Sequence, residues 1–205
     1  MTRHRAREEW ISDILEAAKC EIDEKGYADF SMEAIVRRTG LSKGGIYRFF
    51  GNRSDVALEL FAGCYRTLSE FDMDECVAWN LSLSETVFRL FGRYSMPENA
   101  ARRADRLWVR LLPEVLNDRR FADTRARLIE EITSRFMELA VAVSRRDHVT
   151  LPEDLTQRMP DIFALGVGMM EGFALQSALG SSIADQGRLV RSFFADLEAE
   201  LVRAQ

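Results

Sequence analysis

Apolar residues recur at intervals of three and four positions along almost the whole chain, which is the spacing of amphipathic helices. Very little of the sequence alternates with period two, the signature of a half-buried strand. Most glycines and the four prolines, Pro97, Pro113, Pro152 and Pro160, act as punctuation between the periodic stretches. The pattern predicts an all-α fold of about nine helices. Besides two short helices within residues 31–50, we expect helices near 7–25, 53–72, 84–95, 98–112, 121–146, 155–179 and 185–203.

The composition is that of a globular cytoplasmic protein. Of the 205 residues, 47% are hydrophobic and 30% are charged, and no apolar run approaches the roughly 20 residues that cross a bilayer. The first residues, "MTRHRAREEW", have a basic start without a following apolar stretch, so they do not resemble a secretory signal. The length favours a small domain plus a larger one, which we place at residues 1–52 and 53–205.

Residues able to support catalysis or bind a metal are scarce. Cys20, Cys64 and Cys76 show no C-x-x-C spacing, and only two histidines occur, which argues against a disulfide framework and a zinc site. We interpret the cysteines as reduced and partly buried, with a Cys64–Cys76 thiol sensor as the alternative. The G-x-S-x-G, G-x-x-x-x-G-K-[ST], G-x-G-x-x-G and H-E-x-x-H motifs do not occur. We therefore expect no enzymatic activity, no metal and no cofactor.

The segment "YADFSMEAIVRRTGLSKGGIYRFFGNRSD", residues 27–55, carries closely spaced helix signals. Ser31, Ser42 and Asn52 are each suited to begin a helix as its N-cap, and Gly40 is suited to end one. Two short helices joined by a tight glycine-containing turn and packed on a longer helix form a helix-turn-helix. The segment therefore predicts this motif, with the helix after Ser42 at the surface and anchored by Ile46.

The charge of this region is compatible with a nucleic-acid partner. The net charge is −5, but residues 1–55 hold ten basic and ten acidic residues, and local charge decides phosphate contact. Small residues at 44 and 45 allow close backbone approach, and helix N-terminal amides favour phosphate. Lys43, Tyr47, Arg48 and Arg53 add donors for phosphate oxygens or base edges. The alternative is a helical hairpin whose Tyr47 and Phe49 belong to the core and whose charges are a solvated face.

Residues 1–60 resemble the DNA-binding domain of the tetracycline-repressor (TetR) family. The resemblance rests on "FSMEAI", "RTGLSKGGIYRFF" and "NRSDVAL" in that order, and later on "MMEGFALQ". It implies a homodimeric one-component transcriptional regulator, usually a repressor, whose larger domain binds a small effector. It also implies that Lys43, Gly44 and Gly45 face the major groove, although Gly45 stands where many relatives have threonine. The expected DNA-binding residues are Ser31, Ser42, Lys43, Gly44, Gly45, Tyr47, Arg48, Arg53 and, in the N-terminal arm, Arg3 and Arg5.

The last two expected helices suggest how two chains associate. Their apolar stripes are wider than one small domain needs to bury, so two helices from each chain would form a four-helix interface. The alternative is that these stripes belong to the core of a single chain. A two-fold dimer would set its recognition helices about 34 Å apart and select a palindromic operator. The expected interface residues are Gly166, Met169, Val190, Phe193, Phe194, Leu197 and Leu201.

An effector pocket is expected inside the larger domain, near the helix that joins the two domains. Aromatic and methionine side chains there suit a hydrophobic or aromatic ligand, although each is more often ordinary core. Arg110 and Glu171, if buried, would be its polar anchors. The candidate lining residues are Phe88, Phe91, Trp108, Leu112, Met137, Phe163, Met170 and Phe173.

A different function is possible with the same fold. The small domain could bind another protein rather than DNA, as a helical interaction module. Salt-dependent and sequence-selective DNA binding would separate the two, because counterion release accompanies phosphate contact.

Overall fold

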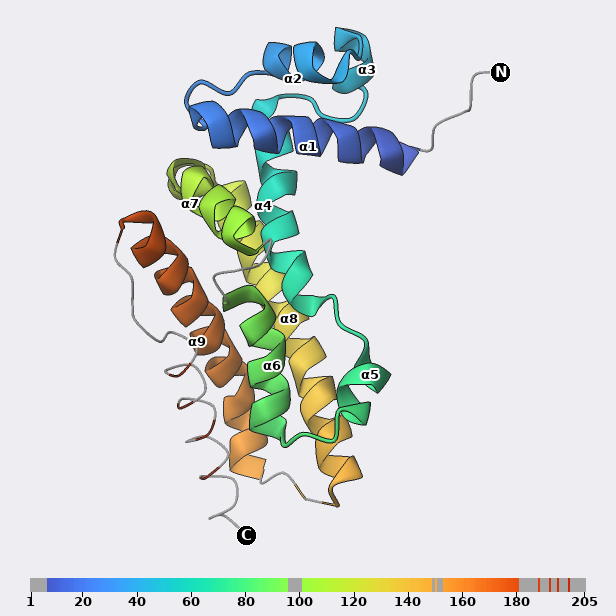
Figure 1. The fold of residues 1–205 in the computed structure, drawn as a ribbon, viewed down its shortest axis with the longest axis vertical. Helices are drawn as coiled ribbons and strands as arrows, with labels where there is room; N and C mark the ends of the chain where they lie inside the picture. The colour runs from blue at the N-terminus through green and yellow to red at the C-terminus, as the bar shows by residue number, and fades with distance from the viewer. Residues whose placement is uncertain are drawn as a thin grey trace. The chain divides into compact units, whose positions relative to one another are not determined.

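The computed structural model describes residues 7–95, 101–148, 150 and 153–180, together with the single positions 188, 192, 195 and 199. Within these residues the secondary structure is entirely helical (Figure 1), which confirms the predicted all-α class. The described helices are α1 (Arg7–Lys25), α2 (Met32–Thr39), α3 (Lys43–Tyr47), α4 (Arg53–Ser69), α5 (Met73–Ala78), α6 (Leu83–Ser95), α7 (Ala101–Asn117), α8 (Arg119–Arg146) and α9 (Glu153–Ala178).

The helices form two compact units. The N-terminal unit comprises Met1–Cys64 and Arg106–Thr124, and the C-terminal unit comprises Tyr65–Asp105 and Arg125–Gln205. The first therefore continues beyond residue 52 into α4 and includes the chain segment where α7 ends and α8 begins. Cys20 and Cys64 are half-buried and Cys76 is buried, and no disulfide joins any two of these described residues.

The core of the N-terminal unit draws on every one of its helices. On α1, Ile14, Ala18 and Ile22 are buried, because residues four apart lie in one row along a helix. Ile11 and Leu15 of the same helix are half-buried. The rings of Phe61 in α4 and Phe121 in α8 meet edge to face at 5.2 Å. The largest fully buried side chains of this unit are Ile14, Ile22, Phe30, Ile35, Ile46, Phe61, Leu111 and Phe121.

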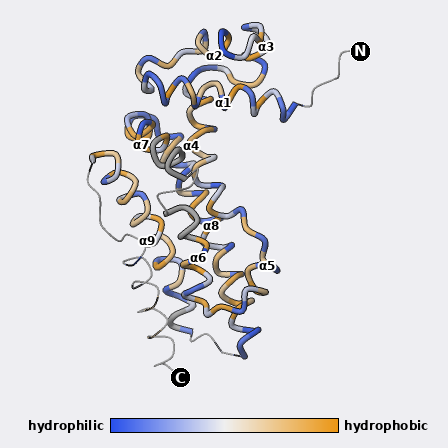
Figure 2. The backbone as a smooth tube through the Cα atoms, in the orientation of Figure 1, coloured by the Kyte–Doolittle hydropathy of each residue, from blue (hydrophilic) through white to orange (hydrophobic). Residues whose placement is uncertain are grey.

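The core of the C-terminal unit centres on α8. Phe136 lies between Phe71 and Phe163, with ring centroids 5.3 Å and 4.9 Å away. Hydrophobic and hydrophilic residues are interspersed along the helices, as the amphipathic period requires (Figure 2). None of the helices in the described part of the chain is both long and apolar enough to span a membrane. The buried residues of α8 and α9 in this unit are Leu128, Ile132, Phe136, Leu139, Ala140, Val143, Ser144, Met159, Phe163, Gly166, Val167 and Ala174.

One expected helix boundary was wrong. The helix expected at 98–112 continues through Pro113 to Asn117. Although proline removes a helical donor, Asn117 Nδ2 donates to Pro113 O at 2.6 Å and Asp118 N donates to Glu114 O at 2.8 Å, so the last turn is held. Pro160 lies inside α9, as the helix expected at 155–179 requires, so neither Pro113 nor Pro160 separates two helices.

The helix α5 was not expected at all, because six residues are too few to show a period. It begins where Asp72 Oδ1 accepts from Glu75 N at 2.8 Å. The guanidinium of Arg146, 65 or more residues away, holds the following turn by donating to Val77 O at 3.0 Å and Leu81 O at 2.5 Å. Apart from four single positions, the helix expected at 185–203 lies outside the described residues.

Candidate nucleic-acid interface

The three predicted N-caps hold the helix-turn-helix together. Ser31 Oγ accepts from Ala34 N at 3.3 Å, Ser42 Oγ from Gly45 N at 3.0 Å, and Asn52 Oδ1 from Asp55 N at 3.0 Å. Gly40 ends α2 with φ 68°, and its N–H donates to Val36 O, a left-handed conformation that suits glycine. The oxygens of both serines predicted to contact DNA therefore already cap helices. An added Cβ on Gly45 would lie 3.2 Å from Ser42 Oγ, so glycine leaves room for this cap.

The short helix α3 is anchored on one side and exposed on the other. Ile46 is fully buried and Phe50 nearly so, while Lys43, Gly44 and Arg48 are exposed. Tyr47 is 42% exposed, so it is a surface residue and not the core residue of the hairpin alternative. The structure therefore presents Lys43, Gly44, Tyr47 and Arg48 on one short helix held by buried neighbours.

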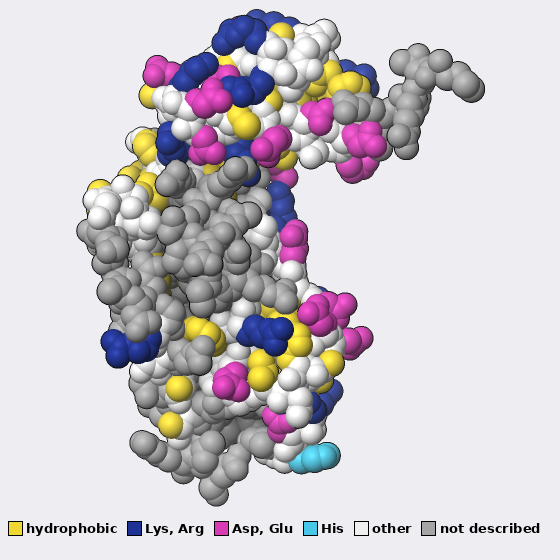
Figure 3. Space-filling view, in the orientation of Figure 1, with side chains coloured by type: hydrophobic (Ala, Val, Ile, Leu, Met, Phe, Trp, Pro, Cys, Tyr) yellow, Lys and Arg dark blue, Asp and Glu magenta, His cyan; other side chains and the backbone are white. Residues whose placement is uncertain are grey.

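Lys43 faces an acid that the sequence interpretation passed over. Its Nζ lies 3.0 Å from Oε1 of Glu33 in α2, and 5.9 Å from the centroid of the Tyr47 ring. The hydrogen bond from Lys43 lowers the pKa of Glu33, and the same bond raises the pKa of Lys43. Acidic and basic side chains are interspersed over the N-terminal elements on the face drawn in Figure 3. The surface around α3 is therefore not uniformly basic.

Arg53, a predicted phosphate contact, has an intramolecular role as well. Its Nη1 donates to Ala28 O at 3.3 Å and Phe30 O at 3.1 Å, and its guanidinium carbon lies 5.0 Å from the centroid of the Tyr27 ring. Burial, followed by the charge of Glu114, raises the pKa of Tyr27. Arg53 thus ties the start of α4 to the loop between α1 and α2. Arg3 and Arg5 lie outside the described residues.

A buried acid joins α1 to α2. The carboxylate of Glu21 is only 6% exposed and accepts from Lys25 at 2.7 Å and from Arg38 Nε at 3.0 Å. Arg38 also bonds to Glu24 at 2.5 Å. The hydrogen bond from Lys25 is the main reason that the pKa of Glu21 is lowered, with burial acting in the opposite direction. The contact between Glu21 and Arg38 therefore links α1 to α2.

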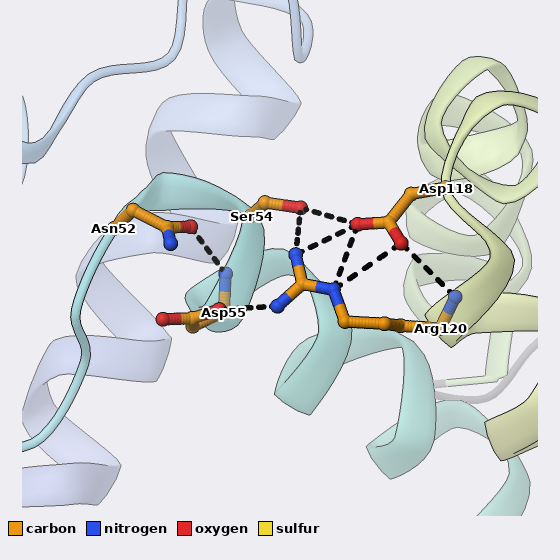
Figure 4. A network of polar contacts seen from close by, with 5 residues as sticks. All are labelled: Asn52, Ser54, Asp55, Asp118 and Arg120. Carbon is orange, nitrogen blue, oxygen red and sulfur yellow. Dashed lines mark hydrogen bonds and ion pairs between the residues drawn. The ribbon is translucent and has the colours of Figure 1, made fainter.

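The start of α4 is tied to the start of α8 by a network of four residues, Ser54, Asp55, Asp118 and Arg120, which we call the junction network (Figure 4). Arg120 Nη1 donates to Asp55 Oδ1 at 2.7 Å, and Nη2 donates to Asp118 Oδ2 at 2.7 Å and to Ser54 Oγ at 3.0 Å. Ser54 Oγ also donates to Asp118 Oδ2 at 3.2 Å. Asp55 follows the Asn52 cap, so the network reaches the end of the helix-turn-helix.

The junction network predicts an acid-sensitive contribution to stability. Hydrogen bonding from Arg120 lowers the pKa of Asp118 to about 2 from its ordinary 3.8. The stabilisation is therefore complete above pH 3.8 and is lost as the pH falls through about 2. We expect Asp118→Asn to be less stable than the wild type at neutral pH, and the difference between their free energies of unfolding to shrink below pH 4. Denaturant unfolding at a series of pH values measures this difference, and a constant difference across the range would contradict the assignment.

The proposed pocket residues are divided between the two units. Phe163 is buried, and Phe88, Met137, Met170 and Phe173 are half-buried in the C-terminal unit. Trp108 and Leu112 are half-buried but belong to the N-terminal unit. The Phe91 side chain lies outside the described residues. The structure therefore does not place the eight residues in one unit.

The two candidate polar anchors have different surroundings. Arg110 is not buried: its Nη1 donates to Ile22 O at 2.9 Å within the N-terminal unit. Glu171 is mostly buried in the C-terminal unit, where it accepts from Arg125 Nε and Nη2 at 2.8 and 2.7 Å and from the Tyr65 hydroxyl at 2.5 Å. Glu171 raises the pKa of Arg125 through this bidentate pair. Among the described residues, no group of three or more His, Cys, Asp or Glu side chains is placed to hold a metal ion.

One side of α9 is apolar and exposed. The helix buries Met159, Phe163, Val167 and Ala174. The opposite side carries the exposed residues Leu165, Gly168, Gly172, Leu175 and Leu179, which follow a spacing of three and four; we call them the α9 face. Of the expected interface residues, Gly166 is buried and Met169 half-buried, so neither belongs to this face. Val190, Phe193, Phe194, Leu197 and Leu201 lie outside the described residues.

Solved structures with the same fold are transcriptional regulators by description. One from Pseudomonas aeruginosa PAO1 aligns with a TM-score of 0.71 at 13% identity, covering 97% of this chain and 95% of that one. A TetR-family regulator from Mesorhizobium loti MAFF303099 aligns with a TM-score of 0.68 at 15% identity, covering 97% and 98%. A regulator from Saccharomonospora viridis in complex with choline has a TM-score of 0.63 at 17% identity, covering 93% and 95%. No curated protein matches the chain.

A helix-turn-helix is a motif through which transcriptional regulators bind DNA. Residues 14–60, which include α2, α3 and the caps described above, match the family of bacterial regulatory proteins named tetR. Residues 14–60 therefore carry a helix-turn-helix of the tetR type, and the chain as a whole shares the fold of the regulators named above.

Proposed function

We propose that the protein is a cytoplasmic, ligand-responsive repressor that binds a palindromic operator as a homodimer and is released by a small effector. The exposed side of α3 carries this proposal: Lys43, Tyr47 and Arg48 project from a helix fixed by buried Ile46, which is how a recognition helix enters the major groove. Residues 1–52 would bind DNA, and residues 53–205 would bind the effector and the second chain. The DNA-contacting residues are Ser31, Ser42, Lys43, Gly44, Gly45, Tyr47, Arg48, Arg53, Arg3 and Arg5.

The α9 face supports the homodimer. Three exposed leucines, Leu165, Leu175 and Leu179, and two exposed glycines lie along one side of this helix. Glycines allow close approach of a second helix, and an exposed apolar stripe of this kind suits a self-complementary two-fold contact. The helix expected at 185–203 would complete a four-helix interface through Val190, Phe193, Phe194, Leu197 and Leu201.

The Tyr65–Glu171–Arg125 cluster supports an effector site in the C-terminal unit. Its half-buried charges are the kind of polar group that orients a ligand in an otherwise apolar pocket, and Phe88, Met137, Phe163, Met170 and Phe173 belong to the same unit. The effector would be small and largely hydrophobic. The Saccharomonospora viridis regulator was solved with choline, so choline is a reasonable first compound to test for a shift in melting temperature.

The junction network is a candidate route from effector to DNA. Its Arg120, on α8, holds the start of α4 by donating to Asp55. The later residues of α8, from Arg125, lie in the C-terminal unit. A movement of α8 on effector binding would therefore act on the network directly. The competing function, a protein-interaction module, has no specific observation in its favour.

Selection of the purified protein against a random pool of double-stranded DNA, at moderate salt, tests the proposal. Enrichment of a palindrome is the expected result. Its affinity should fall steeply with salt, because several phosphates are contacted by each dimer. A failure to enrich any sequence at any salt concentration would reject the operator and, with it, the repressor function.

Substitutions on α3 test the recognition surface. We expect Lys43→Ala and Tyr47→Ala each to lower the affinity for the selected operator by about tenfold, and the lysine variant to reduce the salt dependence as well. Helical content should not change, because both side chains are exposed. Arg119→Ala, which removes a 90% exposed charge from α8, is the control and should bind as the wild type does. Fluorescence anisotropy measures the affinity. A loss of helical content in Tyr47→Ala would show that Tyr47 supports the core and is not a surface contact.

A further inference from the structure

We propose that Glu33 reads DNA bases together with Lys43, and that the pair selects a cytosine–guanine base pair in each operator half-site. The inference rests on the proposed function, because it assigns a base preference to that same interface. Glu33 is the second residue of α2 and Lys43 is the first of α3, so the pair bridges both helices of the motif. The distance between Lys43 Nζ and Glu33 Oε1 is 3.0 Å.

The pair is placed for contact with a partner and not for holding the fold. The side chains of Glu33 and Lys43 are 59% and 64% exposed, and ion pairs so exposed contribute little to stability. The Glu21 side chain, by contrast, is only 6% exposed, and its ion pair with Arg38 joins α1 to α2. The fold therefore already has a buried clamp on α2, and the Glu33–Lys43 pair is additional to it.

A carboxylate at this surface has few suitable partners on DNA. It accepts hydrogen bonds only and repels phosphate oxygens. Two major-groove groups can donate to it, the N4 amino group of cytosine and the N6 amino group of adenine, but the N7 acceptor beside adenine N6 repels a carboxylate, so cytosine suits it better. A lysine suits the O6 and N7 atoms of guanine. A carboxylate and an ammonium group side by side therefore match a cytosine–guanine pair, or two such pairs in succession, better than any other sequence.

The neighbouring residues let the pair reach base edges. Gly44 is exposed, and a Cβ placed on it would meet nothing within 4 Å, so the backbone beside Lys43 can approach the duplex closely. The Tyr47 ring beneath the ammonium group limits where Lys43 extends. The hydrogen bond from Lys43 keeps the pKa of Glu33 low, so the acid remains an acceptor at neutral pH.

The test compares sequence selection by four proteins: wild type, Glu33→Gln, Lys43→Ala and the control Glu16→Gln. Glu16 is also exposed and pairs with Lys19 at 3.8 Å on α1, so its substitution removes the same charge away from α2 and α3. We expect the wild type and the control to select one position with cytosine over thymine by about tenfold. Glu33→Gln should lose this preference at that position and keep the rest of the palindrome. Lys43→Ala should weaken the preference for the guanine it contacts.

Two outcomes separate the possible failures. If the wild type selects a palindrome and Glu33→Gln selects the same one with higher affinity for all sequences, Glu33 only neutralises Lys43, and the inference is overturned while the proposed function stands. If the wild type selects no sequence, the proposed function itself has failed. Circular dichroism of Glu33→Gln should match the wild type, because its exposed side chain does not support the core.

Discussion

A Leu165→Asp/Leu179→Asp double variant is expected to sediment as a monomer, in contrast to a dimeric wild type. The two leucines are 55% and 69% exposed on the α9 face, so the folded chain tolerates aspartate there. In a two-fold dimer both chains would bury the two new aspartates in the interface, and burying an unpaired carboxylate is very costly. Analytical ultracentrifugation at micromolar concentration measures the result.

The same variant should also lose affinity for the palindrome by about 100-fold or more, because a dimer binds its second half-site at a high effective concentration. Leu116→Asp is the matched control: it makes the same change at an 82% exposed leucine on α7 and should remain dimeric. A double variant that still sediments as a dimer would remove the α9 face from the interface. The helix expected at 185–203 would then have to provide the contact alone.

Phe136→Ala is expected to lower the free energy of unfolding by about 3–5 kcal/mol. Phe136 is buried in α8 between the rings of Phe71 and Phe163. Removing the ring leaves a cavity and also deletes two aromatic contacts, and packed neighbours collapse only partly into such a space. Urea denaturation followed by circular dichroism measures the loss.

Leu116→Ala is the control for this loss, since it removes similar volume at an exposed site and should change stability by less than about 0.5 kcal/mol. A loss below about 1 kcal/mol for Phe136→Ala would mean that the three rings are not the centre of the C-terminal unit.

The short-range features of this protein follow from its sequence. The caps at Ser31, Ser42 and Asn52 and the turn at Gly40 all depend on residues within four positions of one another. The all-α class follows from the same local periodicity, since a period needs only a few turns to show itself. The TetR family match covers this segment too. Where the local signal is weak the prediction fails, as at six-residue α5 and at Pro113, where side-chain contacts outweigh the usual helix-breaking effect.

Contacts between distant residues depend on the tertiary structure alone. The partners of Arg120 in α4 lie about 65 positions away, and those of Glu171 lie 46 and 106 positions away. No periodicity or spacing indicates which acid a given arginine will meet, and the same holds for Glu33 beside Lys43, which lie ten residues apart. The sequence by itself determined the helices, the caps and the helix-turn-helix, because these depend on neighbours along the chain. Only the tertiary structure decided which charges pair, which side of α9 stays exposed and which acid stands beside the recognition helix, because those depend on how the helices pack.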